Sequence, residues 1–125
     1  MGRKSITKAT RKKIYDKYDG HCAYCGESIE FNAFHVDHIK PVREMNGVMD
    51  YPENDTIENM VPACRSCNMR KSSGSVEFFR GEMERSVEIL RRDSVTFKFA
   101  ERYGQIKCTP GKVKFYFEQF KEEQK

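Results

Sequence analysis

Cys22-Ala-Tyr-Cys25 and Cys64-Arg-Ser-Cys67 are two CxxC pairs that enclose the 38 residues 26–63. A CxxC turn directs two thiolates to one side, and two such turns complete the tetrahedral shell that Zn²⁺ prefers. The separation exceeds the usual value of about 15–20 residues, so we expect the enclosed segment to be a folded unit closed by the metal. Four thiolates leave no open position on the ion, which predicts a structural zinc.

Disulfides and a redox-active CxxC are the alternatives to zinc. No signal peptide supports an oxidising compartment, and no βαβ pattern surrounds either pair. The fifth cysteine, Cys108, lies outside both pairs, and we expect it to be a small, at least half-buried thiol without a role. His21 precedes the first pair directly, and with four thiolates already in the shell we expect it to be a surface or capping residue.

Asp37, His38 and Asn68 supply a second kind of chemistry beside the cysteines. A carboxylate and an amide oxygen suit Mg²⁺, which is commonly held by one or two protein groups. An imidazole can accept a proton from water near neutral pH. A divalent cation, a base and a phosphate are the minimum for phosphodiester hydrolysis. Each residue alone means little, so the prediction rests on their joint spacing.

Together these residues resemble the motifs of the HNH endonuclease family, over roughly residues 10–75. The matching segments are Cys22-x-x-Cys25, Val36-Asp37-His38-Ile39-x-Pro41, Glu58-Asn59 and Cys64-Arg-Ser-Cys67-Asn68-x-x-Lys71. The resemblance implies a ββα-metal unit in which the Asp-His pair ends the first strand and the last motif residue lies on the helix. The expected fold is therefore α+β, a small ββα core stapled by zinc, with an N-terminal helix and a C-terminal helical extension.

The resemblance also implies roles for single residues. His38 corresponds to the general base, and Asp37 and Asn68 to ligands of a catalytic Mg²⁺ or Mn²⁺. Asn59 corresponds to the residue that orients the histidine and shapes its loop. Many relatives carry His where this chain has Asn68, and both forms occur in the family. The implied products carry a 5′-phosphate and a 3′-hydroxyl.

Basic residues suggest how double-stranded DNA would be bound. Residues 1–18 contain seven bases and one acid, whereas the whole chain has a formal charge of +4. Such a cluster suits phosphate contacts, although a solvated helix face would look the same. The predicted DNA contacts are Lys8, Arg11, Lys12, Arg65, Arg70 and Lys71.

Periodicity predicts the remaining elements. We expect helices over residues 8–18, from the second CxxC pair onward, over 75–91 and over 94–104, and strands over 34–39, 59–63 and 113–117. Residues 95–99 also alternate as a strand would. Residues 41–58 should form a loop. Residues 1–75 are predicted to hold the basic helix and the core, and residues 76–125 an extension that packs on the core or contacts DNA or a second copy.

The chain is 34% charged with a mean hydropathy of −0.80, and no apolar run approaches the length of a membrane span. We expect a bacterial or phage protein of the cytoplasm. The alternative to an endonuclease is a zinc-stabilised DNA-binding module without catalysis, which would not need Asp37, His38 and Asn68 together. One ββα site attacks one strand, so a double-strand break would require a homodimer or two sequential cuts.

Overall fold

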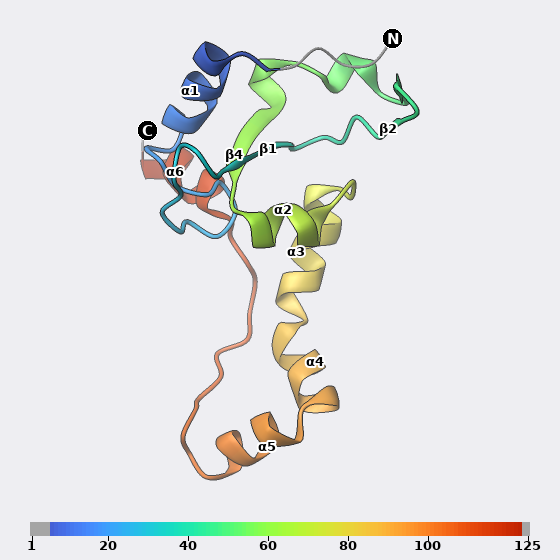
Figure 1. Ribbon diagram of the computed structural model, residues 1–125. Coiled ribbons are helices and arrows are strands. Elements are labelled where there is room, and N and C mark those ends of the chain that lie inside the picture. The colour runs from blue at the N-terminus through green and yellow to red at the C-terminus, as the bar shows by residue number, and fades with distance from the viewer. Residues whose placement is uncertain (1–5, 124–125) are drawn as a thin grey trace.

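A two-stranded antiparallel sheet and one short helix form the centre of the fold (Figure 1). The structure is a computed structural model that describes residues 6–123, with side chains up to residue 120. β1 (His35–His38) pairs with β4 (Met60–Ala63), with Asp37 opposite Val61. β4 runs directly into α2 (Arg65–Lys71), so the expected ββα unit is confirmed.

The segment between β1 and β4 contains more structure than the predicted loop. β2 (Glu44–Met45) and β3 (Val48–Met49) form a short hairpin, and two 3-10 turns follow at Pro52–Asn54 and Ile57–Asn59. The hairpin turns at Asn46 and Gly47, where φ is 53° and 80°. Both residue types tolerate positive φ, which suits a two-residue hairpin turn.

The N-terminal helix α1 (Lys8–Asp16) packs against the sheet. The Thr7 side chain caps it by accepting a hydrogen bond from the Thr10 amide. Ile14 is fully buried beside Phe34 and Met60. Lys17, just past the helix end, donates to the carbonyls of Ile57 and Met60 at 2.6 and 2.5 Å.

A second cluster of buried side chains joins the two CxxC pairs to the C-terminal part of the chain. Tyr24 packs edge-on against Phe79 and Phe115, with ring centroids 5.4 and 5.3 Å away. The expected strand over residues 113–117 is wrong, because α6 (Tyr116–Glu123) begins there. The alternation of apolar residues was a real packing signal, since Phe115 and Phe117 both contact Tyr24.

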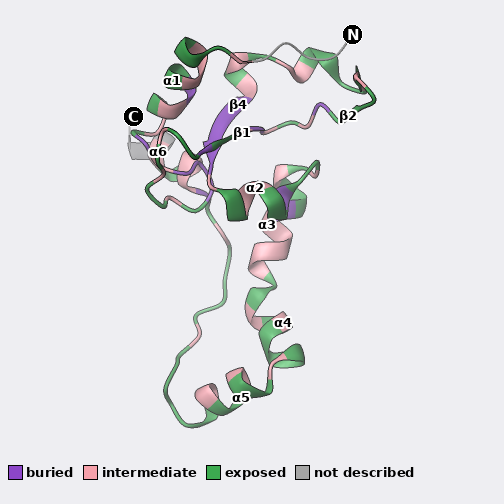
Figure 2. Cartoon of the chain, viewed as in Figure 1, coloured by how far each residue is buried: buried purple, intermediate pink, exposed green. Residues whose placement is uncertain are grey.

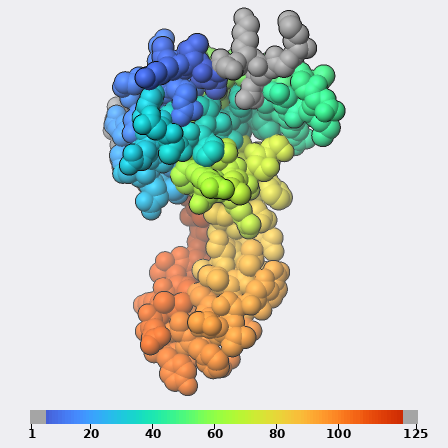
Figure 3. Space-filling model, viewed as in Figure 1, coloured from blue at the N-terminus to red at the C-terminus, as the bar shows by residue number. Residues whose placement is uncertain are grey.

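Residues between Phe79 and Phe115 form an arm that projects from the core (Figures 1 and 3). The expected helix over residues 75–91 is divided at Arg85, which leaves helical geometry with ψ of 3°, into α3 (Val76–Glu84) and α4 (Ser86–Asp93). α5 (Val95–Arg102) confirms the helix preferred over a strand. No residue between Phe79 and Phe115 is buried, as the absence of purple from this region of Figure 2 shows.

Candidate active site

The four cysteines of the two CxxC pairs meet in one cluster. The sulfurs of Cys22, Cys25, Cys64 and Cys67 all lie within 4.8 Å of one another, and those of Cys25 and Cys64 are 3.8 Å apart. Zn–S bonds of about 2.3 Å in a tetrahedron separate sulfurs by about 3.8 Å. The donor set and its spacing therefore fit Zn²⁺, and among residues 6–123 this is the only group of three or more histidine, cysteine or acidic side chains with such geometry.

Local structure explains why the sulfurs converge. Cys64 is the N-cap of α2, and its sulfur accepts from the Cys67 amide at 3.4 Å. On the other side, the Gly26 amide bonds the Cys22 carbonyl, and Gly26 has a φ of 80°. The hydrogen bond from the Cys67 thiol lowers the pKa of Cys22, and the same bond raises the pKa of Cys67. A metal ion bound here would displace the thiol protons.

Asp37 is held on one side of β1 by two buried partners. The Tyr24 hydroxyl donates to Oδ2 of Asp37 at 2.5 Å, and the Lys71 ammonium lies 3.1 Å from the same oxygen. Burial and the adjacent Asp37 charge raise the pKa of Tyr24, which keeps its hydroxyl protonated as a donor. Lys71 also donates to the His38 carbonyl at 2.8 Å. One end of the carboxylate is therefore fixed by the first CxxC turn and by α2.

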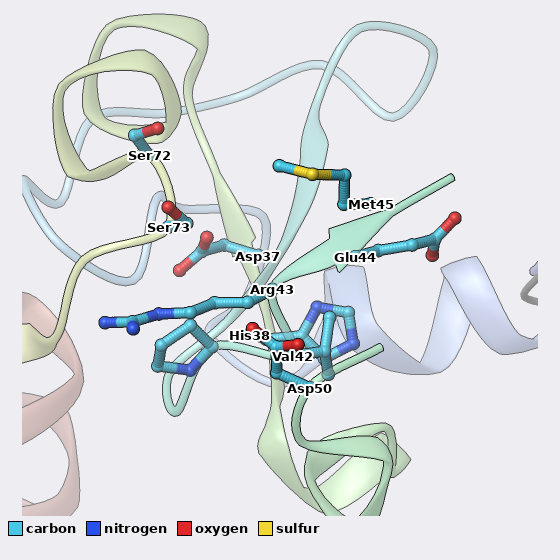
Figure 4. A pocket seen from close by; sticks show the side chains of 10 residues that line it. Asp37, His38, Val42, Arg43, Glu44, Met45, Asp50, Ser72 and Ser73 are labelled. Carbon is cyan, nitrogen blue, oxygen red and sulfur yellow. The ribbon is translucent and has the colours of Figure 1, made fainter. Parts of the chain in front are cut away.

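The side chain of His38 points away from that of Asp37 (Figure 4). It contacts the side chain of Asp55. Nε2 of His38 lies 2.9 Å from Oδ1 of Asp55, and the His38 side chain is only 8% exposed. A carboxylate only accepts hydrogen bonds, so this contact places the proton on Nε2 and leaves the Nδ1 lone pair to accept a proton. This carboxylate–histidine pair has the arrangement of a general base with its orienting group.

Asn59 fixes the loop on which this pair depends. Its amide nitrogen donates to the carbonyls of Lys40 and Asn54 at 2.8 and 2.7 Å, and its oxygen accepts from the Lys40 amide at 3.0 Å. These three bonds join Lys40, the second residue after β1, to the turn before Asp55. The side chain therefore holds together the two segments that carry His38 and Asp55.

Asp37 and His38 both line a cavity of about 440 Å³. Its other walls come from residues 41–45 and Asp50 and from the turn after α2, where Ser72 and Ser73 lie (Figure 4). A strict strand sends neighbouring side chains to opposite faces. The cavity reaches both because β1 ends at His38, as the family resemblance implied.

Asn68 lies on α2, three residues before Lys71 and thus on the same face of that helix. The residues that line the cavity do not include it. The Asp37 carboxylate and the Asn68 amide carry hard oxygens of the type that Mg²⁺ prefers, so their donor chemistry suits a divalent cation. Oδ1 of Asp37 is the oxygen not engaged by Tyr24 or Lys71.

The residues predicted to contact DNA do not form one surface. The Lys71 side chain is fully buried, so its prediction as a phosphate contact is wrong. Arg11 donates to the carbonyls of Phe31 and Phe34 at 3.3 and 3.1 Å and lies over the Phe34 ring. Arg70 is exposed but pairs with Glu82 at 3.2 Å. Arg65 is exposed as well.

Lys8 and Lys12 are exposed on α1, which lies at the opposite end of the core from β2 (Figure 1). Of the other bases in the N-terminal cluster, Arg3 and Lys4 lie outside the described residues. His21, expected to be a surface or capping residue, contacts the Tyr18 carbonyl at 3.1 Å and stacks on Tyr116. Cys108 is half-buried, as expected.

Sequence reasoning missed Tyr24 and Asp55. Asp55 is one of five acids between residues 41 and 58, and nothing local distinguishes it from the others. Tyr24 lies between Cys22 and Cys25, and its position inside the CxxC turn was the one available signal that it would be buried.

Residues 22–74 match the model of the HNH endonuclease family. The CRISPR-associated endonuclease Cas9 of Corynebacterium diphtheriae is 33% identical over 73 residues, which are 58% of this chain and 6% of that protein. YoqL of Bacillus subtilis, an SPbeta prophage-derived protein whose name places it among HNH endonucleases, is 29% identical over 84 residues, covering 58% of this chain and 32% of YoqL. The chain thus spans less than a third of either relative.

The type II-C Cas9 of Actinomyces naeslundii is a structural neighbour with a TM-score of 0.52 and 24% sequence identity. The match covers 66% of this chain and 9% of that one, and it supports the fold. None of the described helices is long and apolar enough to cross a membrane.

Proposed function

We propose that this chain, whose residues 22–74 belong to the HNH endonuclease family, is a metal-dependent endonuclease that hydrolyses phosphodiester bonds of double-stranded DNA. The observation that carries the proposal is the lining of one cavity by Asp37 and His38, with His38 held through Nε2 by Asp55. A zinc-stabilised binding module without catalysis would have no need for this arrangement. In this proposal, Zn²⁺ at the four cysteines is structural.

His38 is the proposed general base. With Nε2 engaged by Asp55, Nδ1 removes a proton from a water molecule in the cavity, and the resulting oxygen nucleophile attacks phosphorus in line with the departing 3′-oxygen. The Asp55 carboxylate stabilises the imidazolium that forms and keeps the ring oriented. Asn59 holds the two loops in register through its three hydrogen bonds. The products carry a 5′-phosphate and a 3′-hydroxyl.

Asp37 and Asn68 would hold Mg²⁺ or Mn²⁺, which when bound neutralises charge on the phosphate and on the leaving oxygen. Tyr24 and Lys71 orient the Asp37 carboxylate from its other oxygen. They link this ligand to the zinc turn and to α2, so the proposed structural zinc controls the geometry of the proposed catalytic ion.

Cleavage of supercoiled plasmid by zinc-loaded protein, with Mg²⁺ or Mn²⁺ added, tests the proposal. We expect wild type to convert plasmid to open-circular or linear DNA. His38→Ala should lower the rate by about a hundredfold to ten-thousandfold, because the general base is lost. Asp55→Asn keeps a side chain of the same shape without the charge. Its cleavage rate should lie between those of wild type and His38→Ala. His35→Ala, an exposed histidine on the same strand, is the matched control and should retain the wild-type rate.

Two results would contradict the proposal. Equal cleavage by wild type and His38→Ala would remove the assigned base. Intact plasmid with every variant, accompanied by retarded migration, would favour the binding module. Band ratios of open-circular to linear DNA would separate nicking from double-strand cutting, and sedimentation would show whether the protein is a homodimer.

A further inference from the structure

The outer end of the arm gathers two cations and two aromatic rings on one helix face. Val95, Lys98, Phe99 and Arg102 of α5 and its C-cap Tyr103 lie at positions i, i+3, i+4, i+7 and i+8, so they share one face. We call these five residues the outer face of α5. Tyr103 is 78% exposed and Phe99 48% exposed, and the Arg102 guanidinium lies 5.4 Å from the Phe99 ring centroid.

The acidic residues near this face are already paired. Glu101 binds Arg91 of α4 at 2.5 and 3.0 Å, and Asp93 binds its neighbour Arg92. Within the described part of the chain, no ion pair forms at the four cations of residues 94–112. These four are Lys98, Arg102, Lys107 and Lys112. Lys98, Arg102 and Lys107 lie on or just after α5, so the outer end of the arm presents positive charge that no described ion pair neutralises, whereas Lys112 precedes Val113, whose amide bonds Glu84 at the end of α3.

The arm begins beside the cavity. Ser73 lines the cavity, and α3 starts at Val76, three residues later. α3 and α4 contain nine and eight residues, so at 1.5 Å per residue the two helices together reach about 25 Å. That distance corresponds to about seven base pairs of duplex. In the space-filling view the arm is a lobe that extends away from the core (Figure 3).

We infer that the outer face of α5, with Lys107, is a second DNA-binding surface that holds the phosphate backbone away from the cleavage site. Lysine and arginine bind phosphate by charge, and a tyrosine hydroxyl can donate to it. This inference rests on the proposed function in taking DNA as the ligand of the cavity. Phosphate contacts do not depend on the base sequence, so this surface adds affinity and orientation without base recognition.

A second copy of the chain fits this face less well. A twofold interface would place the same patch of cations against itself, and like charges in contact repel. Lysine is also depleted from protein–protein interfaces relative to the rest of the surface. The mixture of exposed rings and unpaired cations instead complements a polyanion.

Two double variants of equal charge test the inference. Lys98→Ala/Arg102→Ala removes two unpaired cations from the outer face of α5. Arg85→Ala/Arg92→Ala removes two cations that are already paired with acids on α3 and α4. Binding is followed by fluorescence anisotropy of a labelled 30-base-pair duplex, with zinc-loaded protein and no added Mg²⁺, at several salt concentrations.

We expect the first variant to weaken binding more than about fivefold and to reduce the slope of log K against log salt by about 2, since each phosphate contact contributes about 0.9. The control variant should change affinity less than about twofold with an unchanged slope. Equal effects of the two variants, or no effect of the first, would overturn the inference. So would a wild-type dimer in sedimentation that Tyr103→Ala converts to a monomer.

Plasmid cleavage separates this result from the proposed function. If wild type cuts no plasmid but the Lys98/Arg102 variant loses affinity, the arm binds DNA and the nuclease proposal fails. If wild type cuts plasmid and the two double variants bind equally, the nuclease stands and the arm is not a DNA-binding surface.

Discussion

The core and the arm use charged residues in opposite ways. In the core, Lys71 is fully buried and meets Asp37, and His38 meets Asp55 in an almost enclosed position. In the outer part of the arm, the described ion pairs of Arg91 with Glu101 and of Arg92 with Asp93 lie at the surface, and no residue between Phe79 and Phe115 is buried. Buried charges are stable only with specific partners, whereas exposed pairs contribute little. The charges of the core thus have fixed partners and geometry, whereas those of the outer arm remain accessible to solvent.

Among the changes that test this difference between core and arm, removal of zinc should have the largest effect on stability. Structural Zn²⁺ in small domains supplies about 10–16 kcal/mol of apparent binding free energy, which matches or exceeds the total stability of most domains. Chelation, or Cys67→Ser, is therefore expected to unfold the core. The arm should unfold with it, because Phe79 and Phe115 anchor its two ends in the core cluster.

Far-UV circular dichroism and zinc content by mass spectrometry measure this outcome. Cys108→Ser is the matched control, since that cysteine lies outside the cluster, and it should keep one zinc per chain and an unchanged Tm. A chelated protein with a native spectrum would show that apolar packing alone holds the ββα unit. The core would then fold without a metal ion, although the spacing of its four sulfurs fits Zn²⁺.

Breaking the buried pair in the core should have the next largest effect. Lys71→Met leaves Asp37 without its cation, and removal of one partner from a buried pair costs about 3–5 kcal/mol. Arg70→Met removes the adjacent cation, which is 54% exposed, and should cost less than about 1 kcal/mol. Urea denaturation of both variants gives the two free energies of unfolding. Similar values would mean that the core does not depend on its buried charge.

The difference between Arg70 and Lys71 also marks the limit of what the sequence could reveal. Cysteine spacing predicted the four-cysteine cluster, and the order of motifs predicted the ββα unit, because both depend on local chemistry. Arg70 and Lys71 look alike in the sequence, and only the packing of α2 on β1 buries one and exposes the other. Asp55 was equally hidden, since its contact with His38 spans 17 residues through a loop fixed by Asn59.

The division of the long helix was hidden for a related reason. Apolar residues recur every three or four positions from Val76, Phe79 and Met83 to Val87 and Leu90. Nothing in this pattern marks the end of the helix at Arg85. The first three lie in or against the core, whereas Leu90 is 42% exposed on the arm. Periodicity records which face of a helix is apolar and does not record what covers it.

The smallest effect is expected at the outer end of the arm. Tyr103→Ala removes a side chain that is 78% exposed and should change the free energy of unfolding by less than about 0.5 kcal/mol. Phe79→Ala is the aromatic counterpart in the core, 1% exposed, and should cost about 3–5 kcal/mol. Urea denaturation at two protein concentrations distinguishes packing within the chain from packing against a second copy. A large loss for Tyr103→Ala that grows with protein concentration would place a partner chain on this face. A small loss at both concentrations leaves the ring free for the phosphate contact inferred above, because a residue that contributes nothing to folding can be retained for binding.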